Sequence, residues 1–239
     1  MELAPCISQI ATLLADPKRS AMVWALIDGT ARGSEELASL AGVSTSSACA
    51  HLARLSAGGL LRHESRGRKR FFRLAAPEVG AAVEALASVS VARSDNVGPS
   101  PMLAAPMSMR RARICGEHLG GELAADLFQR LVVHGWVEQI DQRVEVTSKG
   151  SALFAGFGIF TQALAHHQHP IACACCDWSG RRPHLGGALG ASLMKLFMQS
   201  GWLRLNEDSR TLQVSSTGLF HITRIGQQAQ AGPAVQAVP

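Results

Sequence analysis

The stretch that decides the fold runs from Ser34 to Leu61 and reads SEELASLAGVSTSSACAHLARLSAGGLL. Its apolar residues recur at helical spacing in two short segments, which predicts two amphipathic helices. Gly42 ends the first segment, because a left-handed residue is favoured where a helix stops before a tight turn. Ser44 is the expected N-cap of the second helix, which continues to Ser56. This pattern is typical of a helix-turn-helix whose second helix recognises DNA.

The exposed face of the predicted recognition helix carries mostly short hydroxyl side chains. Hydroxyl groups at a helix N-terminus allow close approach to phosphates and to base edges. The residues from which we expect DNA contacts are Ser44, Thr45, Ser46, Ser47, His51 and Arg54.

A basic hairpin is predicted directly after this helix. Residues 60–64 and 69–74 alternate like strands on either side of a short turn. Six basic residues and one acid lie between Arg62 and Arg73, which is typical of a wing that lies against the DNA backbone. A solvated basic hairpin without a partner is the alternative. The wing residues expected to contact DNA are Arg66, Arg68, Lys69 and Arg70.

The composition indicates a globular protein with a polyanionic partner. The chain has 239 residues, 47% of them hydrophobic, and a formal net charge of +5. This length can hold two domains with cores of their own, and no apolar run is long enough to span a bilayer. The N-terminus lacks the pattern of a signal peptide, so we expect a cytoplasmic protein whose six cysteines are reduced.

Three further helices are predicted around the helix-turn-helix. The first spans Leu3 to Leu14. The second begins at Asp16 and Pro17, because aspartate is a good N-cap and proline is tolerated in the first helical turn. The third follows the wing, from Pro77 to about Val91.

In these residues the chain resembles the ArsR/SmtB family of winged-helix repressors. The resemblance rests on Asp16-Pro17-Lys18-Arg19, on Glu36-Leu37-Ala38, and on the stretches 43–55 and 67–74, and it covers residues 1–93. It implies a homodimer, paired through its first and last helices, that represses transcription until an effector releases it from DNA. Two recognition helices related by dimer symmetry require a palindromic double-stranded operator.

The chain departs from this family at the familiar metal sites. Arsenic-sensing members carry a cysteine pair in the helix that here reads Glu35–Leu40 and contains no cysteine. Zinc-sensing members carry Asp/His and His/Glu pairs on the last helix, where this chain offers only Glu78 and Glu84. Neither site can be carried over, because a metal ion needs several converging ligands.

A second domain is predicted beyond a linker at residues 94–106. It spans residues 107–226 and contains a repeat, since His118-Leu119-Gly120-Gly121 returns as His184-Leu185-Gly186-Gly187 at an offset of 184 − 118 = 66. Each copy reads as a helix, a glycine stop, a hairpin and a helix, which is the second half of a winged helix.

The predicted fold class is therefore mainly α with small β-hairpin wings (α+β). An N-terminal winged helix-turn-helix, residues 1–93, precedes two winged-helix-like repeats that pack with pseudo-symmetry. The composition of residues 227–239 predicts a disordered tail.

Three histidines and three cysteines lie between His166 and Cys176, which makes the segment 166–177 a candidate sensor. The chain also resembles longer ArsR-like regulators here, at Cys175, Asp177, Trp178, Ser179, Arg181, Arg182, His184 and Leu185, and again at Cys115 and His118. The candidate effector residues are Cys115, His118, Cys175, Cys176, Asp177 and His184.

Three interpretations of these residues stay open. In the first, Cys173, Cys175 or Cys176 and a histidine bind a metal ion, since thiolate and imidazole ligands suit zinc or softer ions; this ion is the one candidate cofactor. Alternatively, nearby basic groups at Arg181, Arg182 and His184 could lower a thiol pKa and create a redox switch. In the third interpretation the cysteines are small buried hydrophobes, His118 and His184 cap the repeat helices, and an organic effector occupies an apolar cleft.

The sequence favours a transcription regulator over an enzyme. Cys175 with His184 or His118 could form a hydrolase dyad, but no nucleophile elbow accompanies them. We therefore expect a sequence-specific DNA-binding repressor. Its effector, a small molecule, a metal ion or an oxidant, is expected to be sensed in residues 107–226.

Overall fold

The protein forms two compact units. Unit 1 comprises Met1–Arg110 with Asn206–Thr211, and unit 2 comprises Arg111–Leu205 with Leu212–Pro239. The computed structural model describes residues 3–92, 106–140, 143–165, 170–176, 182–206 and 209–227. Among these residues, no helix has the length and apolar character that crossing a membrane requires.

Some sequence expectations fall outside the described residues. They are residues 94–105 of the predicted linker, residues 228–239 of the predicted tail, and the side chains of His166, His167, His169, Asp177, Trp178, Ser179 and Arg181.

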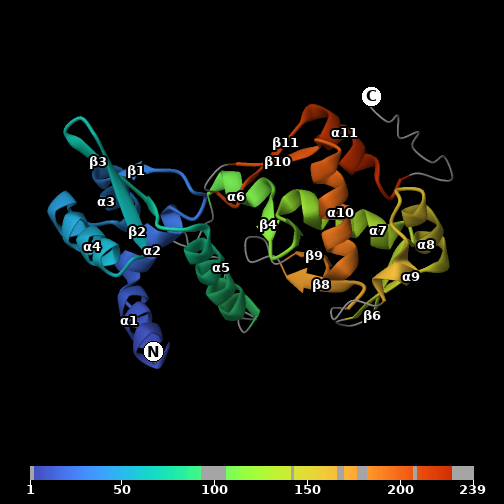
Figure 1. The fold of residues 1–239 in the computed structure, drawn as a ribbon, viewed down its shortest axis with the longest axis horizontal. Coiled ribbons are helices and arrows are strands. Elements are labelled where there is room, and N and C mark those ends of the chain that lie inside the picture. Colours follow the sequence, from blue (N-terminus) through green and yellow to red (C-terminus); the bar gives the residue numbers. More distant parts are fainter. Residues whose placement is uncertain are drawn as a thin grey trace. The chain divides into compact units, whose positions relative to one another are not determined.

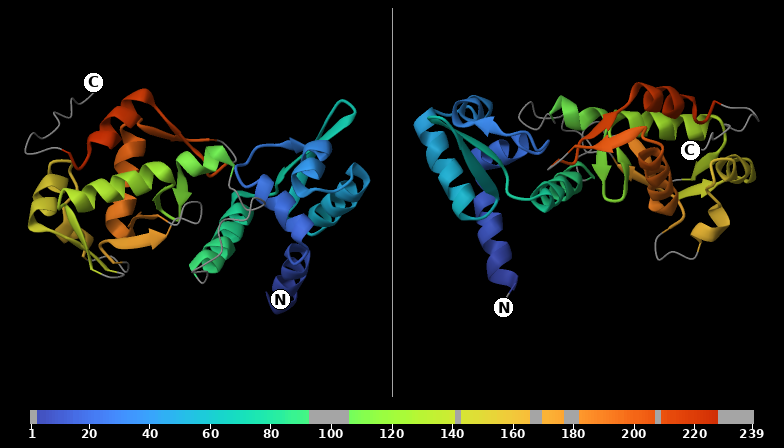
Figure 2. Two further views of the ribbon diagram at one scale, coloured as in Figure 1. Left: turned by 180° about the vertical axis from the view of Figure 1, so that it is seen from behind. Right: turned by 45° about the horizontal axis from the view of Figure 1, so that its top comes forward.

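Unit 1 is a winged helix-turn-helix (Figure 1). Its elements are α1 (Leu3–Leu14), α2 (Pro17–Ala25), β1 (Arg32–Gly33), α3 (Ser34–Ala41), α4 (Thr45–Ala57), β2 (Leu61–Arg66), β3 (Lys69–Leu74) and α5 (Pro77–Ala92), followed by α6 (Met107–Arg111). The wing β2–β3 projects beyond the helices (Figure 2). The short strand β1, which the sequence did not predict, pairs with β3 and gives a sheet of order β1-β3-β2.

The predicted helix-turn-helix is confirmed in its local detail. Gly42 adopts a left-handed conformation with φ 63° at the end of α3. The hydroxyl of Ser44 accepts a hydrogen bond from the backbone N–H of Ser47 at 3.2 Å and caps α4. Apolar side chains on the inner faces of both helices are buried together: Leu37, Ala38, Ala41, Ala48, Leu52 and Leu55. Burial on one face leaves the opposite face of α4 exposed.

The motif from Asp16 to Arg19 holds three helices together. The Asp16 carboxylate caps α2 by accepting from the backbone N–H groups of Lys18 and Arg19, at 2.9 and 3.0 Å. The buried Arg19 guanidinium donates to the carbonyl of Leu13 at the end of α1, at 2.6 Å. Lys18 Nζ donates to the carbonyl of Ala41 at the end of α3, at 3.0 Å. The motif therefore satisfies helix ends that would otherwise leave polar backbone groups unpaired.

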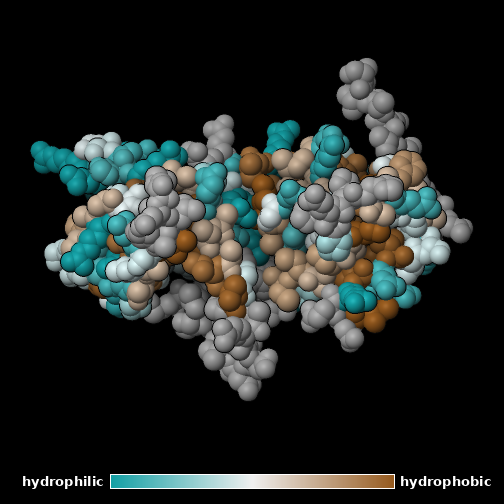
Figure 3. Space-filling model, turned by 60° about the horizontal axis from the view of Figure 1, so that its bottom comes forward, coloured by the Kyte–Doolittle hydropathy of each residue, from teal (hydrophilic) through white to brown (hydrophobic). Residues whose placement is uncertain are grey.

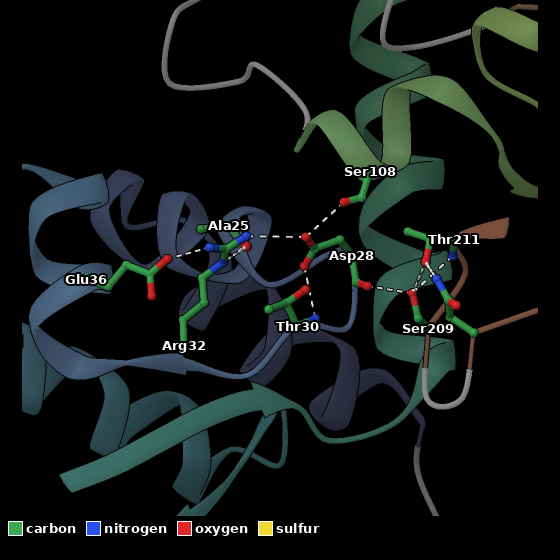
Figure 4. A network of polar contacts seen from close by, with 9 residues as sticks. Ala25, Asp28, Thr30, Arg32, Glu36, Ser108, Ser209 and Thr211 are labelled. Carbon is green, nitrogen blue, oxygen red and sulfur yellow. Dashed lines mark hydrogen bonds and ion pairs between the residues drawn. The ribbon is translucent and has the colours of Figure 1, made fainter. Parts of the chain in front are cut away.

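A polar network around the buried Asp28 closes unit 1 (Figure 4). The Asp28 carboxylate accepts from Ser108 Oγ at 3.0 Å and pairs with Arg32 at 3.3 Å. Ser209 donates its hydroxyl to the Asp28 carbonyl, and Arg210 Nε pairs with the buried Glu84 carboxylate at 2.9 Å. These contacts place residues 206–211 in unit 1, so the chain passes between the two units three times.

Unit 2 contains two copies of one element order. The first copy is β4 (Arg113–Cys115), β5 (His118–Gly120), α7 (Glu122–Val133), β6 (Val137–Ile140), β7 (Arg143–Val146) and α8 (Ser148–Ala155), followed by α9 (Thr161–Leu164). The second copy is β8 (Cys173–Cys176), β9 (Pro183–Gly186), α10 (Gly187–Gln199), β10 (Leu203–Leu205), β11 (Leu212–Val214) and α11 (Ser216–Arg224). The predicted α+β class is confirmed, and each repeat helix is preceded by a further hairpin.

The two copies agree in atomic detail. Thr147 caps α8 by accepting from the N–H of Gly150 at 2.9 Å, and Ser215 caps α11 by accepting from Gly218 at 3.0 Å. A Cβ atom at Gly150 or Gly218 would lie 1.8 or 2.3 Å from the carbonyl oxygen of that repeat's tryptophan. Glycine is therefore required at both positions, because no larger residue permits the helix to approach the strand so closely.

The two copies exchange packing partners. Helix α7 of the first copy packs against β9 of the second, and α10 of the second packs against β5 of the first. Strand β7 pairs with β8 in a sheet of order β6-β7-β8-β9. In return, Leu212 N–H of β11 donates to the carbonyl of Ala112, directly before β4, at 3.0 Å. This reciprocal pattern brings β5 and β9 into contact at the centre of unit 2.

We expect Asp16→Ala to lower the free energy of local unfolding around α2 by about 1 kcal/mol, because the helix loses its N-cap. Hydrogen exchange of the α1–α3 amides measures this change in unit 1 alone. Asp16→Asn is the matched control, because its amide oxygen can accept the same backbone hydrogen bonds. Equal exchange rates in the wild type and in Asp16→Ala would contradict the assigned cap.

The same cap makes unit 1 sensitive to acid. The backbone hydrogen bonds from Arg19 and Lys18, together with the charges of Arg19 and His51, hold the pKa of Asp16 below its ordinary value. The stabilisation is therefore present above the unfolded-state pKa and is lost as the pH falls through the lower folded-state pKa. In Asp16→Asn this part of the acid sensitivity should disappear.

Candidate functional site

Helix α4 and the wing line one groove, to which the wing contributes three of its predicted DNA-binding residues. This groove has a volume of about 660 Å³, and its walls include Cys49 and Ala53 of α4 and Arg68, Lys69 and Arg70 of the wing. All three basic residues are exposed. The recognition helix and the basic hairpin therefore face the same space.

The side chains predicted on α4 differ in accessibility. Thr45, Ser46 and Arg54 are exposed, whereas Ser47 is half-buried and the Ser44 hydroxyl serves as the helix cap. The half-buried His51 lies with Nδ1 4.0 Å from a carboxylate oxygen of Asp16. His51 thus contacts the start of α2, which the sequence pattern did not indicate.

The charges of the wing are held by weak surface contacts. Lys69 Nζ lies 3.7 Å from a Glu35 carboxylate oxygen, and both side chains are more than 70% exposed. The Arg66 guanidinium pairs with Glu64 and lies 4.9 Å from the centre of the Phe71 ring. Exposed ion pairs contribute little to stability, so these cations can exchange their partners for phosphates at small cost.

Four of the predicted effector residues come together in unit 2. The candidate ligand atoms of Cys115, His118, Cys175 and His184 all lie within 4.8 Å of one another. We call these four residues the Cys/His cluster. Cys176 is exposed and is not one of its members. Asp177, the sixth predicted residue, lies outside the described part of the chain.

Strand register explains how the Cys/His cluster forms. Cys115 pairs with His118 across the β4–β5 hairpin, and Cys175 pairs with His184 across the β8–β9 hairpin. Directly paired residues of antiparallel strands carry their side chains on the same face of the hairpin. Since β5 and β9 contact each other, each repeat supplies one cysteine and one histidine to the same place.

Like residues face each other in the cluster. The sulfur atoms of Cys115 and Cys175 are 3.9 Å apart, and the Nε2 atoms of His118 and His184 are 3.2 Å apart. The His184 ring is fully buried, and its Nδ1 atom has no hydrogen-bond partner among the described residues. The cluster is therefore compact and polar, and it lies beside an apolar core.

The repeated glycines make room for the cluster. A Cβ atom at Gly120 would lie 2.9 Å from Cβ of Cys115, and one at Gly186 would lie 3.3 Å from the His118 ring and 3.4 Å from Cβ of Cys175. The interpretation of the two histidines as helix caps is wrong. Their side chains face each other, and the N-cap positions of α7 and α10 are glycines without a side-chain cap.

The two thiols of the cluster differ in acidity. The hydrogen bond from Cys175, supported by hydrogen bonds from His118 and His184, holds the pKa of Cys115 far below its ordinary value. That same hydrogen bond, together with burial and the negative charge of Cys115, raises the pKa of Cys175. Burial also raises the pKa of Cys173. Of these thiols, that of Cys115 is therefore the most acidic.

The described residues therefore contain a Cys/His group close enough to bind a metal ion. The sequence pattern pointed to all four members but not to their forming one site. The histidines follow the repeat offset of 66, whereas the cysteines are only 175 − 115 = 60 residues apart. The second hairpin has the longer loop, which hides the equivalence of the two cysteines.

No protein-family model matches this chain. It is 31% identical over 214 residues to the HTH-type transcriptional regulator YdfF of Bacillus subtilis (strain 168), across 90% of this chain and 94% of YdfF. Among solved structures, reduced HlyU from Vibrio cholerae N16961 covers 36% of this chain and 90% of its own, with 24% identity and a TM-score of 0.34.

The homodimeric winged helix-turn-helix DNA-binding domain of Mb0332 from Mycobacterium bovis covers 40% of this chain and 91% of its own, with 23% identity and a TM-score of 0.35. The similarity to YdfF covers more of the chain than the similarity to either solved structure, because it extends through the winged helix and both repeats. The protein therefore belongs to the HTH-type transcriptional regulators, and unit 1 is its winged helix.

Proposed function

We propose that the protein is a homodimeric repressor that binds a palindromic operator and is released from it by an effector received in unit 2. The observation that carries this proposal is the groove shared by α4 and the basic wing. A helix of this kind enters the major groove with its N-terminal residues against the bases. Basic residues on the wing then meet the flanking phosphates.

The exposed residues divide into two roles on DNA. Thr45 and Ser46 stand at the N-terminus of α4, where short hydroxyl groups reach base edges. Arg54, with the wing residues Arg68 and Arg70, supplies phosphate contacts that position the protein without reading sequence. His51 supports α4 against α2 through Asp16. The preference for an operator then depends on few side chains.

Exposed apolar residues on α1 and α5 support the homodimer. Ile7 of α1 is 68% exposed, and Leu86 and Val89 of α5 are 61% and 60% exposed. Figure 3 turns the lower side of Figure 1 toward the reader, and hydrophobic residues are visible on this surface. Large exposed apolar residues on neighbouring elements often mark an interface. A symmetric pair would place two α4 helices in successive major grooves, roughly 34 Å apart.

The effector is proposed to act at the Cys/His cluster. The familiar metal positions of the winged helix carry no ligand set in this sequence, whereas unit 2 brings four titratable groups together. A ligand changes operator affinity only if it binds the two conformations of the protein unequally. Residues 206–211 belong to unit 1 although their flanking strands β10 and β11 belong to unit 2. Through residues 206–211, a conformational change in unit 2 can reach the DNA-binding unit.

A second candidate function is a thiol-redox response. The sulfur atoms of Cys115 and Cys175 are 3.9 Å apart, and a disulfide needs about 2.05 Å. A peroxide could take two electrons from the pair: the Cys115 thiolate attacks one peroxide oxygen and releases hydroxide, and the Cys175 thiol then displaces the sulfenic oxygen, which leaves with its proton as water. The metal-free cluster is the form in which this response would operate.

We expect the double variant Arg68→Ala/Lys69→Ala to weaken binding to operator and to random duplex alike. The log–log slope of affinity against salt should fall by about two, since each lost phosphate contact removes about 0.9. Fluorescence anisotropy at several salt concentrations measures both quantities. Arg182→Ala removes an exposed cation from unit 2 and should leave the slope unchanged. If the double variant keeps the wild-type slope, the wing does not contact the DNA phosphates.

We expect Leu86→Glu/Val89→Glu to convert the dimer to monomers, because both charged side chains would be buried at the proposed interface. Sedimentation velocity measures the change. Val133→Glu is the matched control, since Val133 of α7 is 66% exposed in unit 2. A wild-type protein that sediments as a monomer at micromolar concentration would contradict the proposal.

A further inference from the structure

Two distances within the Cys/His cluster, sulfur to sulfur and nitrogen to nitrogen, match those of a tetrahedral metal centre. The edges of a tetrahedron are about 1.6 times its centre-to-corner distance, and Zn–S and Zn–N bonds are about 2.3 and 2.0–2.1 Å. The expected separations are then about 3.8 Å between two sulfurs and about 3.3 Å between two nitrogens. The observed separations are 3.9 Å for Cys115 and Cys175 and 3.2 Å for His118 and His184.

The donor set selects the kind of ion. Two sulfurs and two imidazole nitrogens in tetrahedral arrangement suit zinc, whereas magnesium, calcium and manganese prefer oxygen ligands, and the cluster contains no carboxylate. Two thiolates also neutralise the charge of a divalent ion. An uncompensated charge at the fully buried His184 would be costly, so this neutrality matters.

A bound ion would also resolve the polar conflict in the cluster. Without it, only one imidazole can donate in the His118–His184 contact, and the Cys115–Cys175 pair retains one weak S–H hydrogen bond. Buried polar groups are normally satisfied, and a partly satisfied network is unfavourable. Four coordinate bonds would use one lone pair from each residue.

The surroundings leave room for an ion and a way to reach it. Gly120 and Gly186 keep the space beside the ligands free of side chains. A cavity of about 640 Å³ is lined by His118, Cys173 and Gly187, among others, so solvent reaches the edge of the cluster. The ligands themselves are half-buried except His184, which is fully buried.

We propose that Cys115, His118, Cys175 and His184 bind one zinc ion in a closed four-coordinate site that joins the two repeats of unit 2. Four protein ligands leave no open position, so the site is structural or regulatory and does not activate water. This inference names the ligand of the Cys/His cluster. Zinc binding itself does not depend on the proposed function, whereas a role of zinc in operator release rests on it.

The site is tested with the full chain, freed of metal by chelator under reducing conditions. Zinc is then titrated against a chromophoric competitor, and native mass spectrometry counts the bound ions. We expect one zinc ion per chain. Cys115→Ser and Cys175→Ser should each weaken zinc binding by at least about 100-fold. Loss of a residue that only hydrogen-bonds to a metal ligand weakens binding by up to about 100-fold, and loss of a ligand should cost more. The control Cys176→Ser, an exposed neighbour on β8, should bind like the wild type.

A second measurement does not depend on the folding of any variant. Cobalt(II) in the wild-type protein should give the intense visible bands of a tetrahedral centre and a thiolate-to-metal charge-transfer band. A weak octahedral spectrum, a chain that binds no zinc, or serine variants that bind zinc like the wild type would each overturn the proposed site.

The two proposals fail in different ways. Operator binding is measured by anisotropy on the metal-free and the zinc-loaded protein. If no zinc binds but the operator does, the metal site is wrong and the DNA-binding function stands. If zinc binds as expected but neither form prefers the operator over random duplex, the proposed repressor function is wrong and the site stands.

Discussion

The contact between β5 and β9 is the constraint on which unit 2 depends. It exists because α7 packs on the second repeat's β9 while α10 packs on the first repeat's β5. This exchange brings together two histidines that are 66 residues apart and two cysteines that are 60 apart. Any shift between the repeats separates one Cys–His pair from the other. Binding at the cluster and the packing of the repeats are therefore one equilibrium.

Local signals explain why the winged helix could be predicted from sequence. Gly42 and Ser44 fix the turn through a left-handed backbone and a side-chain cap, and neither depends on distant residues. The basic wing was predictable because its residues alternate as in strands and most of its charged residues are basic. The Asp16–Arg19 motif predicts a helix start, but the sequence does not predict its hydrogen bonds to the ends of α1 and α3, which only the structure shows. Propensity does not encode such long-range partners.

The site was predictable in its members but not in its geometry. The repeat pointed to His118 and His184, whereas the longer second loop broke the register between Cys115 and Cys175. The exchange of packing partners between the repeats also has no local signature. The sequence of each hairpin would be compatible with packing on the helix of its own repeat.

Each repeat is proposed to give one thiolate and one imidazole to a single metal centre. X-ray absorption at the zinc edge of the loaded full chain tests this most directly, because it reports the ligand atoms themselves. We expect two sulfurs at about 2.3 Å and two nitrogens at about 2.0–2.1 Å from the zinc ion. A shell of nitrogen and oxygen alone, or a coordination number of six, would contradict it.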